Sequence, residues 1–147
     1  MSGIGYLPGE NKMASALNLV CYNMHGFKNG INALNDLCLK ADIISVEEHW
    51  LAPFDLRKIV NFSDEFQGFG WSAMSDKISS GFLTGRPFGG LGILIRKSLN
   101  VHVEVLAVMH NCRVAWISCT FSNGYKIVFL QFTSPVIIIQ LTMTMRF

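Results

Sequence analysis

Residues 43–51 read Ile-Ile-Ser-Val-Glu-Glu-His-Trp-Leu, and this stretch decides the predicted fold. Its apolar start ends abruptly in two carboxylates, Glu47 and Glu48, which is typical of a buried strand in an open α/β sheet. Such sheets bind ligands at the carboxyl ends of their strands, so Glu48 is the first candidate for a chemical role. The alternative is that Glu47 and Glu48 mark the exit of the strand into solvent, where most Glu side chains lie.

A second strand of the same kind precedes this one. Residues 17–22 form a short apolar run, which is followed by Asn23, His25 and Gly26. Between the two strands, apolar side chains recur at helical spacing as far as Ala41, and Asn29 is the expected N-cap. The pattern predicts a β-α-β unit that brings Asn23 and Glu48 to the same edge of the sheet.

The rest of the chain also predicts an α/β protein. A short helix is expected from Pro53 to Asn61, and a strand is expected around residues 71–73. The glycine-rich residues 75–92 predict a loop. Four further strands are predicted, with a hairpin at Asn123-Gly124 before the last, at residues 93–96, 101–108, 114–120 and 126–132.

Three motifs in this order resemble those of the endonuclease/exonuclease/phosphatase superfamily. They are Tyr22-Asn23-Met24-His25-Gly26, Val46-Glu47-Glu48 and the segment 85–94, which reads Gly-Arg-Pro-Phe-Gly-Gly-Leu-Gly-Ile-Leu. The second motif continues into His49-Trp50-Leu51, which is most similar to the endonuclease domain of LINE-type (non-LTR) retrotransposons. The resemblance spans residues 17–132 and implies the N-terminal half of a four-layer α/β sandwich of the DNase I-like type.

The resemblance implies metal-assisted hydrolysis of a phosphodiester. Carried over to this sequence, Glu48 would hold Mg²⁺ or Mn²⁺, and Asn23 would share the metal or orient the phosphate. Arg86 and Phe88 would contact the substrate, which the resemblance implies to be DNA. Phe88 stands where relatives commonly have a Tyr, so the hydroxyl contact to the phosphate is lost.

Two further residues near these motifs have alternative interpretations. His25 stands where some relatives carry Asp or Asn, and it is either a weak ligand or a supporting surface residue. Trp50 is either a stacking platform for a base or a structural side chain at the rim of the core. Glu47 replaces the usual Gln of the family and adds a carboxylate that need not bind the metal.

The far end of the chain departs from the family pattern. Relatives activate the nucleophile with an Asp and an Asn on one segment and a terminal Asp-His pair, whereas residues 111–147 contain no Asp, Glu or His. We therefore expect weak metal binding and no turnover by this chain alone. The alternatives are a non-catalytic remnant or binding module, and a phosphatase of the same superfamily.

The resemblance divides the chain into three parts. They are a loose leader at residues 1–16, a truncated domain at residues 17–132 and an apolar tail at residues 133–147 that does not resemble the family. Because the second half of the family fold is missing, we expect an uncovered sheet face and self-association through it. The tail should either cover a strand edge or aggregate.

Composition adds few constraints. The chain has 147 residues and a net charge of +2, which is too small to indicate nucleic-acid binding by itself. Its four cysteines have no Cys-x-x-Cys spacing, so free thiols in a reducing compartment are expected. No signal peptide and no run of about 18 apolar residues is visible, which predicts an intracellular protein without a membrane span.

Overall fold

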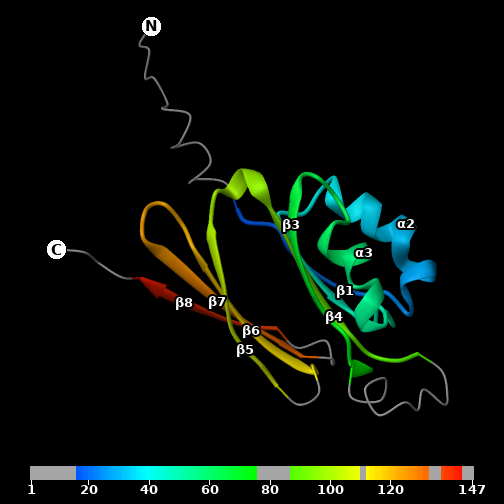
Figure 1. The fold of residues 1–147 in the computed structure, drawn as a ribbon. Coiled ribbons are helices and arrows are strands. Elements are labelled where there is room, and N and C mark those ends of the chain that lie inside the picture. Colours follow the sequence, from blue (N-terminus) through cyan, green and yellow to red (C-terminus); the bar gives the residue numbers. More distant parts are fainter. Residues whose placement is uncertain (1–15, 76–86, 110–111, 133–136, 144–147) are drawn as a thin grey trace, which may run out of the picture.

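The computed structural model describes residues 16–75, 87–109, 112–132 and 137–143, and Figure 1 shows two sheets packed face to face. The first has the order β1-β2-β4-β3 and contains β1 (Leu19–Asn23), β2 (Ile43–Glu47), β3 (Phe66–Trp71) and β4 (Leu91–Arg96). The second is antiparallel in chain order and contains β5 (His102–Met109), β6 (Val114–Thr120), β7 (Tyr125–Phe132) and β8 (Ile137–Met143). The α/β class predicted from the sequence is confirmed.

The predicted β-α-β unit forms the centre of the first sheet. β1 and β2 pair in parallel, with Asn23 opposite Glu47, and α2 (Phe27–Cys38) makes the crossover that parallel strands require. β4 pairs antiparallel with the other side of β2. β2 is therefore a central strand, and each of its five residues is buried.

The helix of this unit begins earlier than predicted. Asn29 is not the N-cap; Gly26 takes that position with φ 94°, and Asn29 lies in the first turn. There the side-chain amide of Asn29 donates to the carbonyl oxygen of His25 at 2.7 Å. Glycine adopts a positive φ without steric cost, which explains why it displaces the better side-chain cap.

Other boundaries differ from the prediction by a few residues. The short helix predicted after Pro53 is confirmed as a 3₁₀ turn, η1 (Pro53–Asp55), followed by α3 (Arg57–Val60). β3 ends at Trp71 rather than centring on residues 71–73, and β4 begins at Leu91 rather than at Ile93. Both strands contain glycines, which favour loops in sequence, and pairing within the sheet overrides that preference.

The second sheet follows the sequence pattern closely. It is connected to β4 through the 3₁₀ turn η2 (Lys97–Leu99). The predicted hairpin between β6 and β7 is confirmed, with Gly124 at φ 89°. In β5 the register with β6 shifts between Val105 and Ala107, which inserts a bulge into this edge strand.

Two hydrophobic cores lie on opposite faces of the first sheet. One fills the space beneath α2 and α3 and includes Ile44, Val46 and Ile59. The other lies between the two sheets, where Ile43 and Ile93 meet Ile117 and Phe129. Because successive side chains of a strand point to opposite faces, the position of Ile43 places Ser45 and Glu47 on the inter-sheet side of β2.

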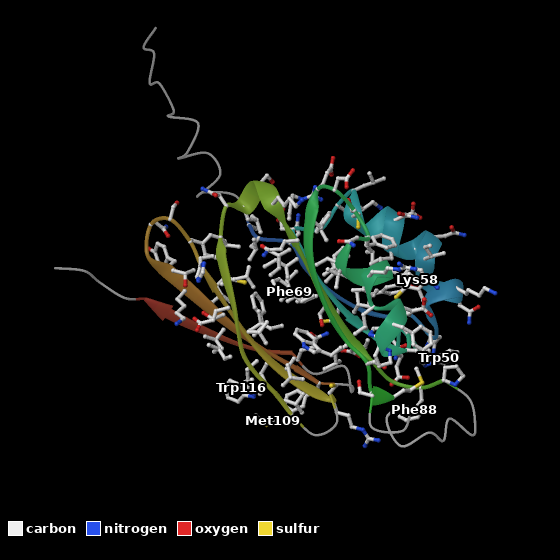
Figure 2. All side chains as sticks on the ribbon, viewed as in Figure 1. Trp50, Lys58, Phe69, Phe88, Met109 and Trp116 are labelled. Atoms are coloured by element: carbon white, nitrogen blue, oxygen red, sulfur yellow. The ribbon has the colours of Figure 1, made fainter. Side chains whose placement is uncertain are left out.

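The expectation of an uncovered inner face on the first sheet is wrong, because the second sheet covers it. Exposed apolar side chains lie instead on the second sheet, where Met109 and Trp116 are 41% and 37% exposed. Figure 2 shows both side chains on the side of this sheet away from the first. Self-association through a sheet face stays a prediction, and this outer face is where the structure supports it.

The tail contributes one strand to the fold. β8 pairs with β7 over its whole length, so this part of the tail covers the edge of β7, one of the two alternatives predicted. The leader at residues 1–15, most of the loop at residues 75–92, Arg86, and residues 133–136 and 144–147 lie outside the described residues. No helix within the described ranges is long and apolar enough to cross a membrane.

Candidate functional site

The three sequence motifs meet at the carboxyl ends of β1 and β2. Backbone hydrogen bonds join the first two motifs, because the amides of Met24, Gly26 and Phe27 donate to the carbonyl oxygens of residues 47, 48 and 49 in turn. The third motif joins from the other side, where the amides of Glu48 and Trp50 donate to the carbonyl oxygens of residues 90 and 89. These segments, far apart in sequence, therefore form one continuous structure at this end of the sheet.

His49 fixes this structure from within. The side chain is fully buried; its Nδ1 accepts a hydrogen bond from the Leu51 amide at 2.9 Å, so the proton of the neutral ring lies on Nε2. From Nε2 it donates to the carbonyl oxygens of Trp71 at 2.9 Å and Leu91 at 3.2 Å. Burial lowers the pKa of His49, although these bonds oppose the effect. With both nitrogens engaged, His49 holds β2, β3 and β4 together and is not available as a metal ligand.

Gly90 makes room for this histidine. A Cβ atom at Gly90 would lie 2.3 Å from Cε1 of His49, and the residue has φ 100°. Both the close approach and the backbone angle exclude other residues. The second glycine of the pair in the third motif, Gly90, is therefore explained by the imidazole in the second motif, whereas a Cβ atom at Gly89 would lie 2.7 Å from Cβ of Ala73.

Glu48 lies just beyond β2 with a left-handed backbone, φ 54°. Its Oε2 accepts hydrogen bonds from the indole Nε1 of Trp50 at 2.9 Å and from the amide of Gly89 at 3.1 Å. Within the described residues both bonds reach the same oxygen, which leaves Oε1 for a ligand. The carboxylate is thus held in one orientation by neighbours from two motifs.

Asn23 lies on the same face of the sheet as Glu47, opposite it in register. Its Oδ1 accepts a hydrogen bond from the amide of His25 at 3.0 Å, a local turn that fixes the side chain. The structure thus brings Asn23 to the end of β1 as predicted, and its nearest strand partner is Glu47, with Glu48 the next residue along. His25 has φ 47° and is exposed, in keeping with a supporting surface role.

Glu47 is the residue whose placement the sequence analysis missed. It is 1% exposed, and burial, followed by repulsion from Glu48, raises its pKa. Burial and the charge of Glu47 also raise the pKa of Cys21, which precedes Asn23 by two residues on the same face of β1. The sequence contained a signal for this burial. Glu47 follows Ile43 and Ser45 at a spacing of two residues, so it lies on the same face of the strand and faces the second sheet.

Trp50 is half-exposed at the rim of this site (Figure 2). One edge of its ring lies over Gly26, where a Cβ atom would come within 2.6 Å of Trp50 Cε3. The indole therefore packs against Gly26, while 37% of the residue stays exposed. Phe88 is partly buried beside the glycine pair of the third motif, and Arg86, the other predicted substrate contact, lies outside the described residues.

The residues at the site fit part of a shell for a hard cation. Glu48 and Asn23 both offer oxygen atoms, the ligand type that Mg²⁺ prefers, and both hydrogen bonds of Glu48 are made by Oε2 and not by Oε1. In the part of the chain that the structure describes, no three His, Cys, Asp or Glu side chains come together as a metal site. Glu48 and Asn23 would therefore supply a half-shell, which waters or a phosphate would have to complete.

Comparisons with known proteins give a weak structural likeness. No family model matches the chain, and no curated protein is significantly similar to it. Among solved structures, the chain is similar to the 3′ phosphatase NExo from Neisseria, which was solved bound to a product DNA hairpin. The sequence identity is 16% and the TM-score is 0.46. The match covers 77% of this chain and 40% of the length of that one.

Proposed function

We propose that this chain is the N-terminal part of a Mg²⁺-dependent phosphodiesterase domain that acts on DNA, of the endonuclease/exonuclease/phosphatase type and closest to the LINE-type retrotransposon branch. The observation that carries the proposal is the junction of the three motifs at one end of the first sheet. The three motifs come from separate parts of the sequence, and their meeting at one edge of the sheet supports the proposal because a shared site requires it.

In this proposal Glu48 is the direct ligand of the metal. Trp50 and Gly89 orient its carboxylate through Oε2, so Oε1 faces the cation without further ordering. Asn23, held by the His25 amide, orients the phosphate or shares the cation. A bound Mg²⁺ would neutralise charge on the scissile phosphate and stabilise the leaving oxygen.

The proposed site is incomplete for turnover. General-base catalysis contributes about a hundredfold to ten-thousandfold in rate, and residues 111–147 contain no Asp, Glu or His that could supply it. We therefore propose that the isolated chain binds a metal and DNA weakly and does not cleave. A non-catalytic remnant or binding module is the second candidate, favoured by the lack of a three-residue metal cluster in the described ranges.

DNA binding with and without metal tests the proposal. We expect the full chain to bind a labelled DNA hairpin more tightly in Mn²⁺ than in a chelator, as measured by fluorescence anisotropy at fixed salt. Glu48→Gln should remove the metal-dependent part, whereas Glu104→Gln, an exposed carboxyl on β5, should retain it. Equal DNA affinity of the unmodified chain in Mn²⁺ and in chelator would contradict the proposal.

A nicking assay on supercoiled plasmid tests the proposed lack of turnover. The account predicts no nicking above background by the chain alone in Mg²⁺. Nicking that survives purification and disappears in Glu48→Gln would show that the catalytic machinery is complete in this chain.

A further inference from the structure

A group of buried oxygen atoms lies between the two sheets and plays no part in the proposed site. Three buried side-chain oxygens have no hydrogen-bond partner among the described residues: Ser45 Oγ, Glu47 Oε1 and Gln131 Oε1. Their side chains are nine-tenths buried or more, with residue exposures of 2%, 1% and 1%. Buried polar groups are usually paired, so three orphans in one region require an explanation.

The strand register brings these three side chains together. Ser45 and Glu47 are two residues apart on the inter-sheet face of β2, with Val46 between them. Gln131 enters from β7 in the second sheet, and its Nε2 donates to the carbonyl oxygens of Val46 and Gly92, both at 2.9 Å. Gln131 therefore lies over the position between Ser45 and Glu47.

The orientation of the Gln131 amide follows from these bonds. Both carbonyl partners are acceptors, so the nitrogen must face them and Oε1 must point elsewhere as an acceptor. An ionised Glu47 is also an acceptor only, and the Ser45 hydroxyl has a single proton to offer. The group thus has more acceptors than donors.

Among the residues that the structure describes, no positive side chain pairs with the carboxylate of Glu47. The ion pairs formed among the described residues are Lys58 with Asp55 and Arg96 with Asp42 and Glu65, all at other positions of the fold. A buried charge without a counter-charge is costly. A hard cation would satisfy a carboxylate, a carboxamide oxygen and a hydroxyl together.

We propose that Ser45, Glu47 and Gln131 form a cation site that joins the two sheets and is separate from the proposed site at Glu48. Ca²⁺ fits it better than Mg²⁺, because Ca²⁺ accepts neutral oxygens in irregular geometry and loses water more readily than Mg²⁺. With one carboxylate and two neutral ligands, the affinity should be weak, with a dissociation constant on the order of 10⁻³ M. The left-handed backbone of Glu48 turns the next carboxylate toward Trp50 and Gly89, away from this group.

Unfolding of the full chain in the presence and absence of cations tests this proposal. We expect 10 mM CaCl₂ to raise the folded-to-unfolded ratio about tenfold over a chelator control, and MgCl₂ to raise it less. Glu47→Gln, which keeps the shape of the side chain, should abolish the Ca²⁺ effect, whereas Glu48→Gln should retain it. The second variant also separates this proposal from the proposed function, which depends on Glu48 and not on Glu47.

Three results of the unfolding measurements would overturn the proposal. Stability that does not respond to Ca²⁺ would show that a proton or a buried water satisfies these oxygens. A Ca²⁺ effect that persists in Glu47→Gln would place the cation elsewhere, and one that disappears in Glu48→Gln would assign it to the other site. If a variant folds too poorly for unfolding measurements, the luminescence of bound Tb³⁺, excited through tryptophan, provides a second readout. Tb³⁺ that Ca²⁺ does not displace from the unmodified chain would also contradict the proposal.

Discussion

The two sheets of this protein differ in how their strand ends are built. In the first sheet, β1 and β2 end in the polar residues Asn23 and Glu47, and residues with positive φ lie just beyond them and just before β4. The fully buried His49 ties the neighbouring ends of β2, β3 and β4 together. In the second sheet, β5, β6 and β7 alternate inner and outer residues, and within the described ranges only Gln131 donates a side-chain hydrogen bond to the first sheet. The comparison indicates that one sheet carries the candidate chemistry while the other supplies the surface that covers it.

Because His49 ties strand ends of the first sheet together, its removal should cause the largest loss of stability among the variants proposed below. His49→Ala leaves the carbonyl oxygens of Trp71 and Leu91 and the Leu51 amide without their partner and opens a cavity, so the free energy of unfolding should fall by about 3 kcal/mol. Urea unfolding measures this loss. His102→Ala, an exposed histidine on β5, is the matched control and should change little. Similar losses in the two variants would show that the ends of the first sheet are not held by His49.

Replacing Gly90 should have the next largest effect. Gly90→Ala forces a Cβ atom against the His49 ring and also requires a positive φ, so we expect a loss of about 2 kcal/mol. Gly124→Ala, at the hairpin of the second sheet, serves as the comparison. Its cost comes from the backbone angle, φ 89°, and should be about 1 kcal/mol. If Gly90→Ala loses no more unfolding free energy than Gly124→Ala, steric contact with His49 does not explain the glycine at position 90.

The outer face of the second sheet should control self-association. Trp116 and Met109 are exposed there, so Trp116→Lys should lower the average mass measured by light scattering at micromolar concentration. Leu39→Lys changes an isolated exposed leucine, 80% exposed, next to α2 and should leave the mass unchanged. A strictly monomeric unmodified chain would contradict the prediction.

Thiol labelling should distinguish a cysteine between the sheets from one at the edge of the first sheet. Cys119 lies between the sheets, and burial raises its pKa to about 11, so it should react with an alkylating reagent only after unfolding. Cys21 is exposed at the edge strand β1 and should react in the folded chain, although its pKa is also raised. Mass spectrometry after limited labelling distinguishes the two sites. Equal labelling rates would mean that the sheets separate readily in solution.

Sequence reasoning predicted most of the first sheet and the strands of the second. The apolar run 43–47 and the helical spacing after Gly26 were sufficient for the β-α-β unit, because both follow from local periodicity. The start of α2 was wrong, since Asn29 is a better side-chain cap than Gly26 but lacks the freedom of φ that the turn requires. The strands β3 and β4 begin earlier than predicted, because the sequence pattern read their glycines as loop residues. The structure shows that α3 packs closely against a glycine of each strand and leaves no room for a side chain there.

The candidate site was predicted in part. Glu48 and Asn23 were identified from the strand ends in the sequence pattern, and the resemblance implied their metal roles. The structure places them on adjoining strand ends. The roles of His49, Gly90 and Gln131 could not be found from the sequence, because each depends on a partner between 39 and 85 positions away. A buried histidine gives no local signal, and Gln131 reads as an ordinary polar residue of a strand.

Mapping of Mn²⁺ by nuclear magnetic resonance tests the central claim, that the three motifs form one metal half-site, most directly. Paramagnetic broadening acts on all nearby amides, whatever their position in the sequence. The account predicts that substoichiometric Mn²⁺ broadens the amide signals of Asn23, Glu48 and Gly89 together, and that Glu48→Gln abolishes this broadening. Broadening confined to one of the three motifs, or unchanged in Glu48→Gln, would contradict the claim.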